Sequence, residues 1–320
     1  MLTLQRILCP VDFSGPSKRA LRYALAVARW HESELAVLYM EDVLLHAATV
    51  EAGGYPGLVA RDYQELRAFI DDAGGSNRNV RVHMATGPVV SGILEHATRE
   101  GSDLIVMGTN GRSGLARAVL GSVTEGVVRQ ATMPVLTIPP SVTVGEFEEL
   151  MPFDSILCAS EFSAACRKAL ELGIVMGQEA DARLILLHAL QRPNLDPGIT
   201  LVPHPVSAGF GVAEFRTDAL ARLKRGFPAD AVFRCRPEAL VGDGCPADAI
   251  LETAVRENVK LIVMGIQTRG ALDRLLFGST TRRVMQAATC PVLSIRDDQG
   301  AGSWPSGRVS TEEELAATTT

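Results

Sequence analysis

The sequence has few aromatic residues and no long apolar run. Phe, Trp and Tyr make up 5% of the 320 residues, although 47% of the residues are hydrophobic. The core must therefore be built from Ala, Val, Leu and Ile, the usual filling of parallel sheets covered by helices. Because no stretch of about 18 apolar residues occurs, we expect no membrane span. The opening segment MLTLQRILCPVDFS lacks a long apolar stretch, so we also expect no secretory signal.

Basic residues are not in excess. Lys and Arg number 31 against 37 Asp and Glu, which gives a net charge of −6. This balance argues against a nucleic-acid partner and against an anionic membrane surface. The six cysteines form no C-x-x-C pair, so we interpret them as free thiols in a reducing cytoplasm.

The motifs of several enzyme classes are also missing. The sequence has no H-E-x-x-H, no G-x-S-x-G and no G-x-x-x-x-G-K-[ST]. The S-G-G-x-D-S and H-x-G-H strings of related synthetases do not occur either. We therefore expect no dedicated catalysis and no metal site built by the protein alone.

The chain contains an internal repeat. Residues 104–138 and 261–295 are identical at 18 of 35 positions, at a constant offset of 157. Near the chain start, RILCPVDFS (6–14) resembles SILCASEFS (155–163) at an offset of 149. The difference of eight residues is predicted to lie in the variable segment after the second strand of each copy, since loops tolerate such changes.

A repeat of this length is a domain duplication. We predict domains over residues 1–140 and 153–296, joined by a linker over 139–152. Residues 297–320 are rich in Gly, Ser, Thr and acidic residues, and this composition is typical of a disordered tail.

Each copy alternates short apolar strands with amphipathic helices. This pattern predicts an α/β fold: two tandem doubly wound parallel sheets of five strands, with helices on both faces. In the first copy we expect strands at 7–11, 35–40, 80–84, 104–107 and 134–138, and helices that begin after Ser14 and span about 60–73, 88–99 and 119–131.

A glycine-rich loop follows the fourth strand, where doubly wound sheets bind ligands. Glycines at 108, 111 and 121 would let the main chain approach a ligand without Cβ atoms in the way. Ser122 and Thr124 begin the next helix, whose N-terminus favours anions. We therefore expect this loop to bind a di- or triphosphate together with a divalent ion. The alternative is a purely structural role, in which these glycines only end a strand and begin a helix.

The opening ILCPVDFS, the stretch DLIVMGTNGRSG and the spacing G-x-x-G-x9-G-S resemble the ATP-binding branch of the universal stress protein family. The resemblance covers both copies. It implies a sheet of order 3-2-1-4-5 of the adenine-nucleotide alpha hydrolase-like type, binding of ATP or ADP together with Mg²⁺, dimeric assembly, and a role in stress or dormancy. It implies no established reaction.

The resemblance also implies which residues bind nucleotide. Asp12, beside Pro10 and Val11, would contact adenine or ribose, although it also suits a helix cap. Met40 would offer main chain to adenine, and Met107 and Gly108 would line the ribose. The phosphates would be held by Gly111, Gly121, Ser122, Val123 and Thr124.

The second copy departs from this pattern. It retains Gly265, Gly278, Ser279 and Thr281, but Asp12 becomes Glu161, and Gly111 becomes Thr268. Glu161 would push into the nucleoside space, so nucleotide binding by the second copy stays open.

Three functions fit these observations. The first is an ATP-binding regulatory stress protein without catalysis, which the sequence favours. The second is a slow Mg²⁺-dependent ATPase or phosphotransferase, and the third is an interaction module with vestigial pockets. In the order 3-2-1-4-5 the fifth strand of each copy is an apolar edge. We therefore predict that residues 134–138 and 291–295 pair antiparallel, which makes an internal pseudo-dimer, and that two chains form a homodimer.

Overall fold

The structure is a computed structural model that describes residues 4–41, 57–76, 80–111, 120–142, 153–190, 210–227, 235–267 and 278–297. The predicted linker lies outside these ranges from residue 143 to 152, and the predicted tail lies outside them from residue 298 onward. Within the described ranges, no helix combines the length and the apolar character needed to cross a membrane.

The elements of the two domains follow one plan. The first domain contains β1 (Arg6–Val11), α1 (Gly15–Trp30), β2 (Glu34–Glu41), α3 (Gly57–Asp72), β3 (Val80–Thr86), α4 (Val89–Arg99), β4 (Leu104–Gly108), α5 (Ser122–Gln130) and β5 (Val135–Ile138). The second contains β6 (Ser155–Ala159), α6 (Ala164–Glu179), β7 (Arg183–Leu190), α7 (Phe210–Arg225), β8 (Arg236–Asp243), α8 (Pro246–Arg256), β9 (Leu261–Ile266), α9 (Ser279–Ala287) and β10 (Val292–Arg296).

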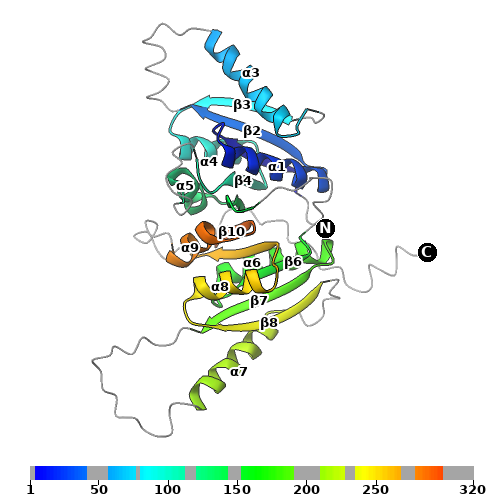
Figure 1. The fold of residues 1–320 in the computed structure, drawn as a ribbon, viewed down its shortest axis with the longest axis vertical. Coiled ribbons are helices and arrows are strands. Elements are labelled where there is room, and N and C mark those ends of the chain that lie inside the picture. The colour runs from blue at the N-terminus through cyan, green and yellow to red at the C-terminus, as the bar shows by residue number, and fades with distance from the viewer. Residues whose placement is uncertain are drawn as a thin grey trace, which may run out of the picture.

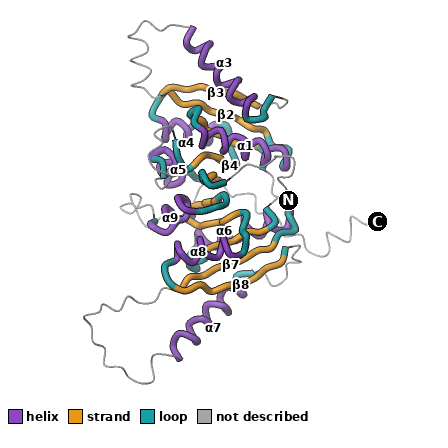
Figure 2. The backbone as a smooth tube through the Cα atoms, in the orientation of Figure 1, coloured by secondary structure: helices purple, strands orange, loops and turns teal. Residues whose placement is uncertain are grey.

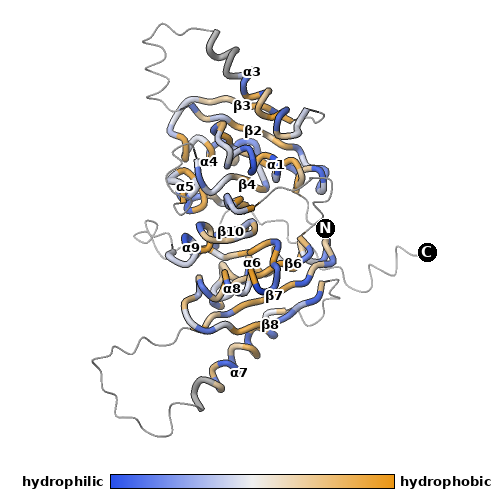
Figure 3. The backbone as a smooth tube through the Cα atoms, viewed as in Figure 1, coloured by the Kyte–Doolittle hydropathy of each residue, from blue (hydrophilic) through white to orange (hydrophobic). Residues whose placement is uncertain are grey.

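All ten strands join in one sheet of order β3-β2-β1-β4-β5-β10-β9-β6-β7-β8. Each half has the predicted order 3-2-1-4-5 and is parallel throughout, so the predicted fold class is confirmed. The strands form a continuous layer along the molecule, with α3 and α7 at its opposite ends (Figures 1 and 2). Hydrophobic residues recur along the strands and alternate with hydrophilic ones along the helices (Figure 3).

Helices cover both faces of the sheet. Leu21, Leu66, Leu170 and Leu223 place α1, α3, α6 and α7 on one buried cluster. The second cluster holds buried residues of α4, α5, α8 and α9. The helix starts are set locally: the hydroxyl oxygen of Ser14 accepts the N–H of Ser17 at 3.2 Å, and this confirms the predicted cap.

Half of the length difference between the copies lies directly after the second strand, where the sequence predicts it, and half lies after the next helix. The offset is 149 residues from β2 to β7, 153 from α3 to α7, and 157 at the ends of β3 and β8. The extra residues are therefore split evenly before and after α7.

One helix begins later than predicted. The helix expected from residue 119 starts at Ser122, because Gly121 has an extended backbone and its N–H donates to the carbonyl of Thr109 at 2.8 Å. This hydrogen bond ties Gly121 to the loop after β4 and keeps it out of the helix. Other element ends differ from the prediction by only a few residues, as expected for frayed ends.

The two domains meet through antiparallel pairing of β5 with β10, as predicted. Leu136 lies opposite Leu293, its own counterpart at an offset of 157. The hydroxyl of Thr137 donates to the carbonyl of Val292 at 3.1 Å, and its counterpart Ser294 donates to the carbonyl of Val135 at 3.2 Å. The pairing is therefore pseudo-twofold symmetric, and it covers both apolar edges.

A charge pair breaks this symmetry. Glu125 of α5 lies 2.5 Å from Arg282 of α9, and these residues also occupy equivalent positions. Because both are partly exposed, their pairing contributes at most about 1 kcal/mol. We expect Arg282→Glu to lower the midpoint of thermal unfolding by a few degrees, and Glu125→Arg with Arg282→Glu to recover it. A double variant no more stable than the single one would show that the pair does not contribute.

Candidate functional site

The candidate site of the first domain lies at the carboxyl ends of β1 and β4. Asp12 follows β1 directly, and its Oδ1 accepts the N–H of Ser14 at 3.0 Å. Phe13 next to it has a φ of 62°, a value that bulky side chains rarely adopt. The turn therefore holds the Asp12 carboxyl group near the start of α1, where it contributes to the helix entry.

The glycine loop packs against this carboxyl group. A Cβ atom on Gly111 would lie 2.8 Å from Oδ2 of Asp12. A Cβ atom on Gly121 would lie 3.3 Å from the carbonyl oxygen of Thr109 and 3.7 Å from the nitrogen of Gly111. The fold thus brings Asp12, Gly111 and Gly121 together, and side chains larger than glycine would crowd the space among them.

Helix α5 begins in this space without a side-chain cap. Its N-cap is Gly121, whereas Ser14 and Ser163 cap α1 and α6 with hydroxyl groups. The first N–H groups of a helix have no acceptor inside it. Ser122 is exposed at this point and Val123 is half-buried. The start of α5 therefore offers backbone N–H donors and the positive end of a helix dipole to an anion.

The hydroxyl group of Thr124 forms a hydrogen bond within the protein. Its hydroxyl donates to the carbonyl of Gly108 at 2.8 Å, and the residue is buried. In this structure the hydroxyl therefore joins α5 to the end of β4. The predicted role of Thr124 at the phosphates stays a prediction.

Gly108 also has a packing role. A Cβ atom there would lie 3.0 Å from the backbone carbonyl group of Pro16, so α1 can approach β4 only over a glycine. Pro10, Val11 and Met107 are buried beneath the site. The side chain of Met40 packs against α4, since a Cβ atom on Gly92 would clash with its terminal methyl group.

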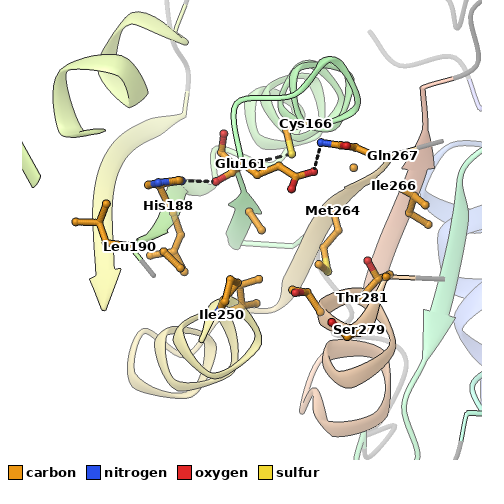
Figure 4. A pocket seen from close by; sticks show the side chains of 18 residues that line it. Glu161, Cys166, His188, Leu190, Ile250, Met264, Ile266, Gln267, Ser279 and Thr281 are labelled. Atoms are coloured by element: carbon orange, nitrogen blue, oxygen red, sulfur yellow. Dashed lines mark hydrogen bonds between the residues drawn. The ribbon is translucent and has the colours of Figure 1, made fainter. Parts of the chain in front are cut away.

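The second domain has a pocket of about 660 Å³ at the equivalent place (Figure 4). Gly265, Gly278, Ser279 and Thr281 all line it, so the structure brings the predicted residues of the second copy together. Gly278 caps α9 without a side-chain hydrogen bond, as Gly121 does for α5. Such a volume lies within the range of small-molecule sites.

Glu161 lies at the mouth of this pocket. Its Oε1 accepts the side-chain N–H of Gln267 at 2.6 Å, which joins the ends of β6 and β9. Sequence reasoning missed Gln267, although its alignment with Asn110 could have pointed to it. Thr268, the counterpart of Gly111, lies outside the described residues.

His188 lines the same pocket from β7. Its Nδ1 donates to the carbonyl oxygen of Ser160 at 2.8 Å (Figure 4). Its ring also packs on Phe162, with centroids 4.5 Å apart. This geometry gives His188 a structural position in the pocket wall. Phe162 has a φ of 63°, so the unusual turn of Phe13 recurs in the second copy.

The strand cysteines are poor nucleophiles. Complete burial raises the pKa of the Cys9 and Cys158 thiols far above its ordinary value, and burial raises that of Cys290 to about 12. All six cysteines are unpaired, as predicted. Among the described residues, no group of three His, Cys, Asp or Glu could hold a metal ion.

Fold and site together define a class: tandem, doubly wound α/β proteins in which a helix with a glycine N-cap begins at the switch point of each domain. The chain belongs to the Universal stress protein family, whose sequence model matches residues 3–139 and 152–296. Membership of the family, which the sequence motifs indicated, is thereby confirmed.

Relatives match one copy or both. A universal stress protein of Methanocaldococcus jannaschii is 32% identical over 139 residues, which are 42% of this chain and 81% of that protein. A Mycobacterium tuberculosis universal stress protein is 25% identical over 306 residues, 91% of this chain and 96% of that one. The crystal structure of a universal stress protein from Archaeoglobus fulgidus covers 91% of this chain and 98% of its own, with a TM-score of 0.62 and 22% identity. This likeness shows the shared fold.

Proposed function

We propose that this protein is a regulatory stress protein whose first domain binds ATP or ADP, with Mg²⁺ held by the nucleotide phosphates. It acts without dedicated catalysis, in the cytoplasm, and as a homodimer. The observation that carries the proposal is the cradle formed by Asp12, Gly111 and the uncapped start of α5.

The cradle suits a nucleotide in two respects. The backbone at Gly111 and Gly121 leaves room that a Cβ atom would occupy, and the first N–H groups of α5 supply donors for phosphate oxygens. Asp12 stands at the other side of the loop, where its carboxylate accepts hydrogen bonds from a ribose or adenine group. The buried residues Val11 and Met107 give the nucleoside an apolar floor.

Gly121→Val tests this assignment. The backbone of Gly121 has φ −63° and ψ 141°, which valine adopts readily, so the domain should fold. The branched side chain should nevertheless fill the phosphate space and weaken ATP binding to the first domain about 100-fold, or about 2.7 kcal/mol. Isothermal titration with Mg²⁺-ATP measures the change.

Gly278→Val is the matched control, since it makes the same change in the second domain. It should leave the affinity of the first domain unaltered, and any loss of a second binding event would assign a site to the second copy. Wild-type affinity in the Gly121→Val protein would refute the proposed phosphate site. Phosphate release from the bound ATP would favour the ATPase alternative.

A further inference from the structure

A second cavity, of about 340 Å³, lies between α6 and α7 in the second domain. Its apolar wall includes Leu170, Leu186 and Leu223, and three arginines lie around it: Arg167, Arg222 and Arg225. We call it the arginine cavity. It shares only Ser160 and Cys166 with the lining of the larger pocket.

The first domain provides an internal comparison. The N–H of Ala73 donates to the carbonyl of Ile70 at the end of α3, and the N–H of Gly226 donates to that of Leu223 at the end of α7. The two helices therefore align at an offset of 153 residues, which their boundaries also give. Each residue of the arginine cavity on α7 then has a defined counterpart on α3.

The comparison shows that two positions of α7 differ from α3 in size or charge, and one of them, Arg222, lines the cavity. Leu66, fully buried in the first domain, corresponds to Ala219, so the second domain has a smaller side chain at this core position. Phe69 packs edge-on against Phe13 with centroids 5.5 Å apart, but its counterpart is Arg222. Two bulky apolar side chains that fill the first domain are thus absent from the second.

The charges differ as well. In the first domain Lys18 forms an ion pair with Asp72 at this place. The counterparts are Arg167 and Arg225, so an acid–base pair is replaced by two cations. Within the described part of the chain, Arg167, Arg222 and Arg225 form no ion pair with a carboxylate.

Arg222 already has a defined position. Its guanidinium carbon lies 4.0 Å from the centroid of the Phe162 ring. Stacking of this kind uses the face of the guanidinium group and leaves its N–H donors at the edge for an anion. The hydroxyl group of Ser163 lies at the same wall, at the N-terminus of α6.

We propose that the arginine cavity binds a small amphipathic carboxylate: an acyl chain on the leucine wall, with its head group among the three arginines. Guanidinium groups bind carboxylates through paired hydrogen bonds. Burial of a hydrocarbon chain against the apolar lining removes its surface from water, which is favourable in free energy. The site is independent of the nucleotide site in the first domain, and its ligand differs in class.

Titration of the full chain with decanoate, below its micelle concentration, tests the proposal. Saturable binding at one site per chain is expected. The variant Ala219→Leu with Arg222→Phe restores the first-domain residues and should weaken binding at least about tenfold. Arg225→Asp, a surface replacement that also restores a first-domain residue, should weaken it to a similar degree.

The controls separate charge from apolar contact. Decyltrimethylammonium, with the same chain and the opposite charge, should not bind, and Gly278→Val should leave decanoate affinity unchanged. The proposal is overturned if decanoate shows no saturable binding, if both variants bind it as the wild type does, or if decanol binds as tightly as decanoate. Thermal unfolding of each variant verifies that it is folded.

Discussion

Val135→Lys combined with Val292→Lys should separate the two domains and lower the unfolding midpoint of the protein by at least about 10 °C. Val135 and Val292 are 1% and 0% exposed, and they lie in the strands that pair across the domain seam. A buried ammonium group without a partner costs several kcal/mol, roughly 3 or more for each lysine. Small-angle scattering should show a larger radius of gyration, and limited proteolysis should cut the linker sooner.

A surface variant with the same added charge is the control for this experiment. Phe215 of α7 and Val255 of α8 are 70% and 65% exposed. Replacing both with lysine should change stability by less than about 1 kcal/mol in total. If the buried double variant shows the same radius and the same cleavage rate as this control, the seam does not hold the domains together.

Much of the fold could be predicted because the sequence pattern of one domain occurs twice in the chain. The constant offsets indicated the duplicated domains. The apolar fifth strands indicated the seam between them, at whose centre Leu136 pairs with Leu293. The start of α5 could not be predicted from periodicity. It depends on the hydrogen bond from Gly121 to Thr109, a contact between a loop and a strand end.

The candidate site was predicted in outline from its glycines, but the reasons differ from one glycine to the next. Gly111 and Gly121 lie close to the Asp12 carboxyl group and to the loop after β4, whereas Gly108 is required by the close approach of α1. A sequence motif does not distinguish these cases, since both appear as a bare backbone position. The arginine cavity was not predictable either, because Ala219 and Arg222 align with α3 only once both helices are placed.

Gly265→Ala should destabilise the second domain by about 3 kcal/mol or more, with a fall of roughly 10 °C in its unfolding midpoint. A Cβ atom on Gly265 would lie 2.3 Å from the carbonyl carbon of Ala165 and 2.5 Å from the nitrogen of Cys166. These are backbone atoms in the first turn of α6, so no side-chain rotation relieves the contact. The helix must move away from β9, and its buried face then loses contact with the sheet.

Two further alanine variants make this prediction specific. In Gly108→Ala the nearest backbone atoms are 3.0 Å away, so the same change in the first domain should cost less. Gly278→Ala meets only the hydroxyl oxygen of Thr281, at 3.8 Å, and should cost no more than about 1 kcal/mol. Calorimetry of the three proteins should therefore rank them Gly265, Gly108 and Gly278 in decreasing loss of stability. If Gly265→Ala has the same unfolding midpoint as Gly278→Ala, the tight approach of α6 to β9 is not a constraint on the fold. The role of Gly265 would then lie in the pocket that it lines.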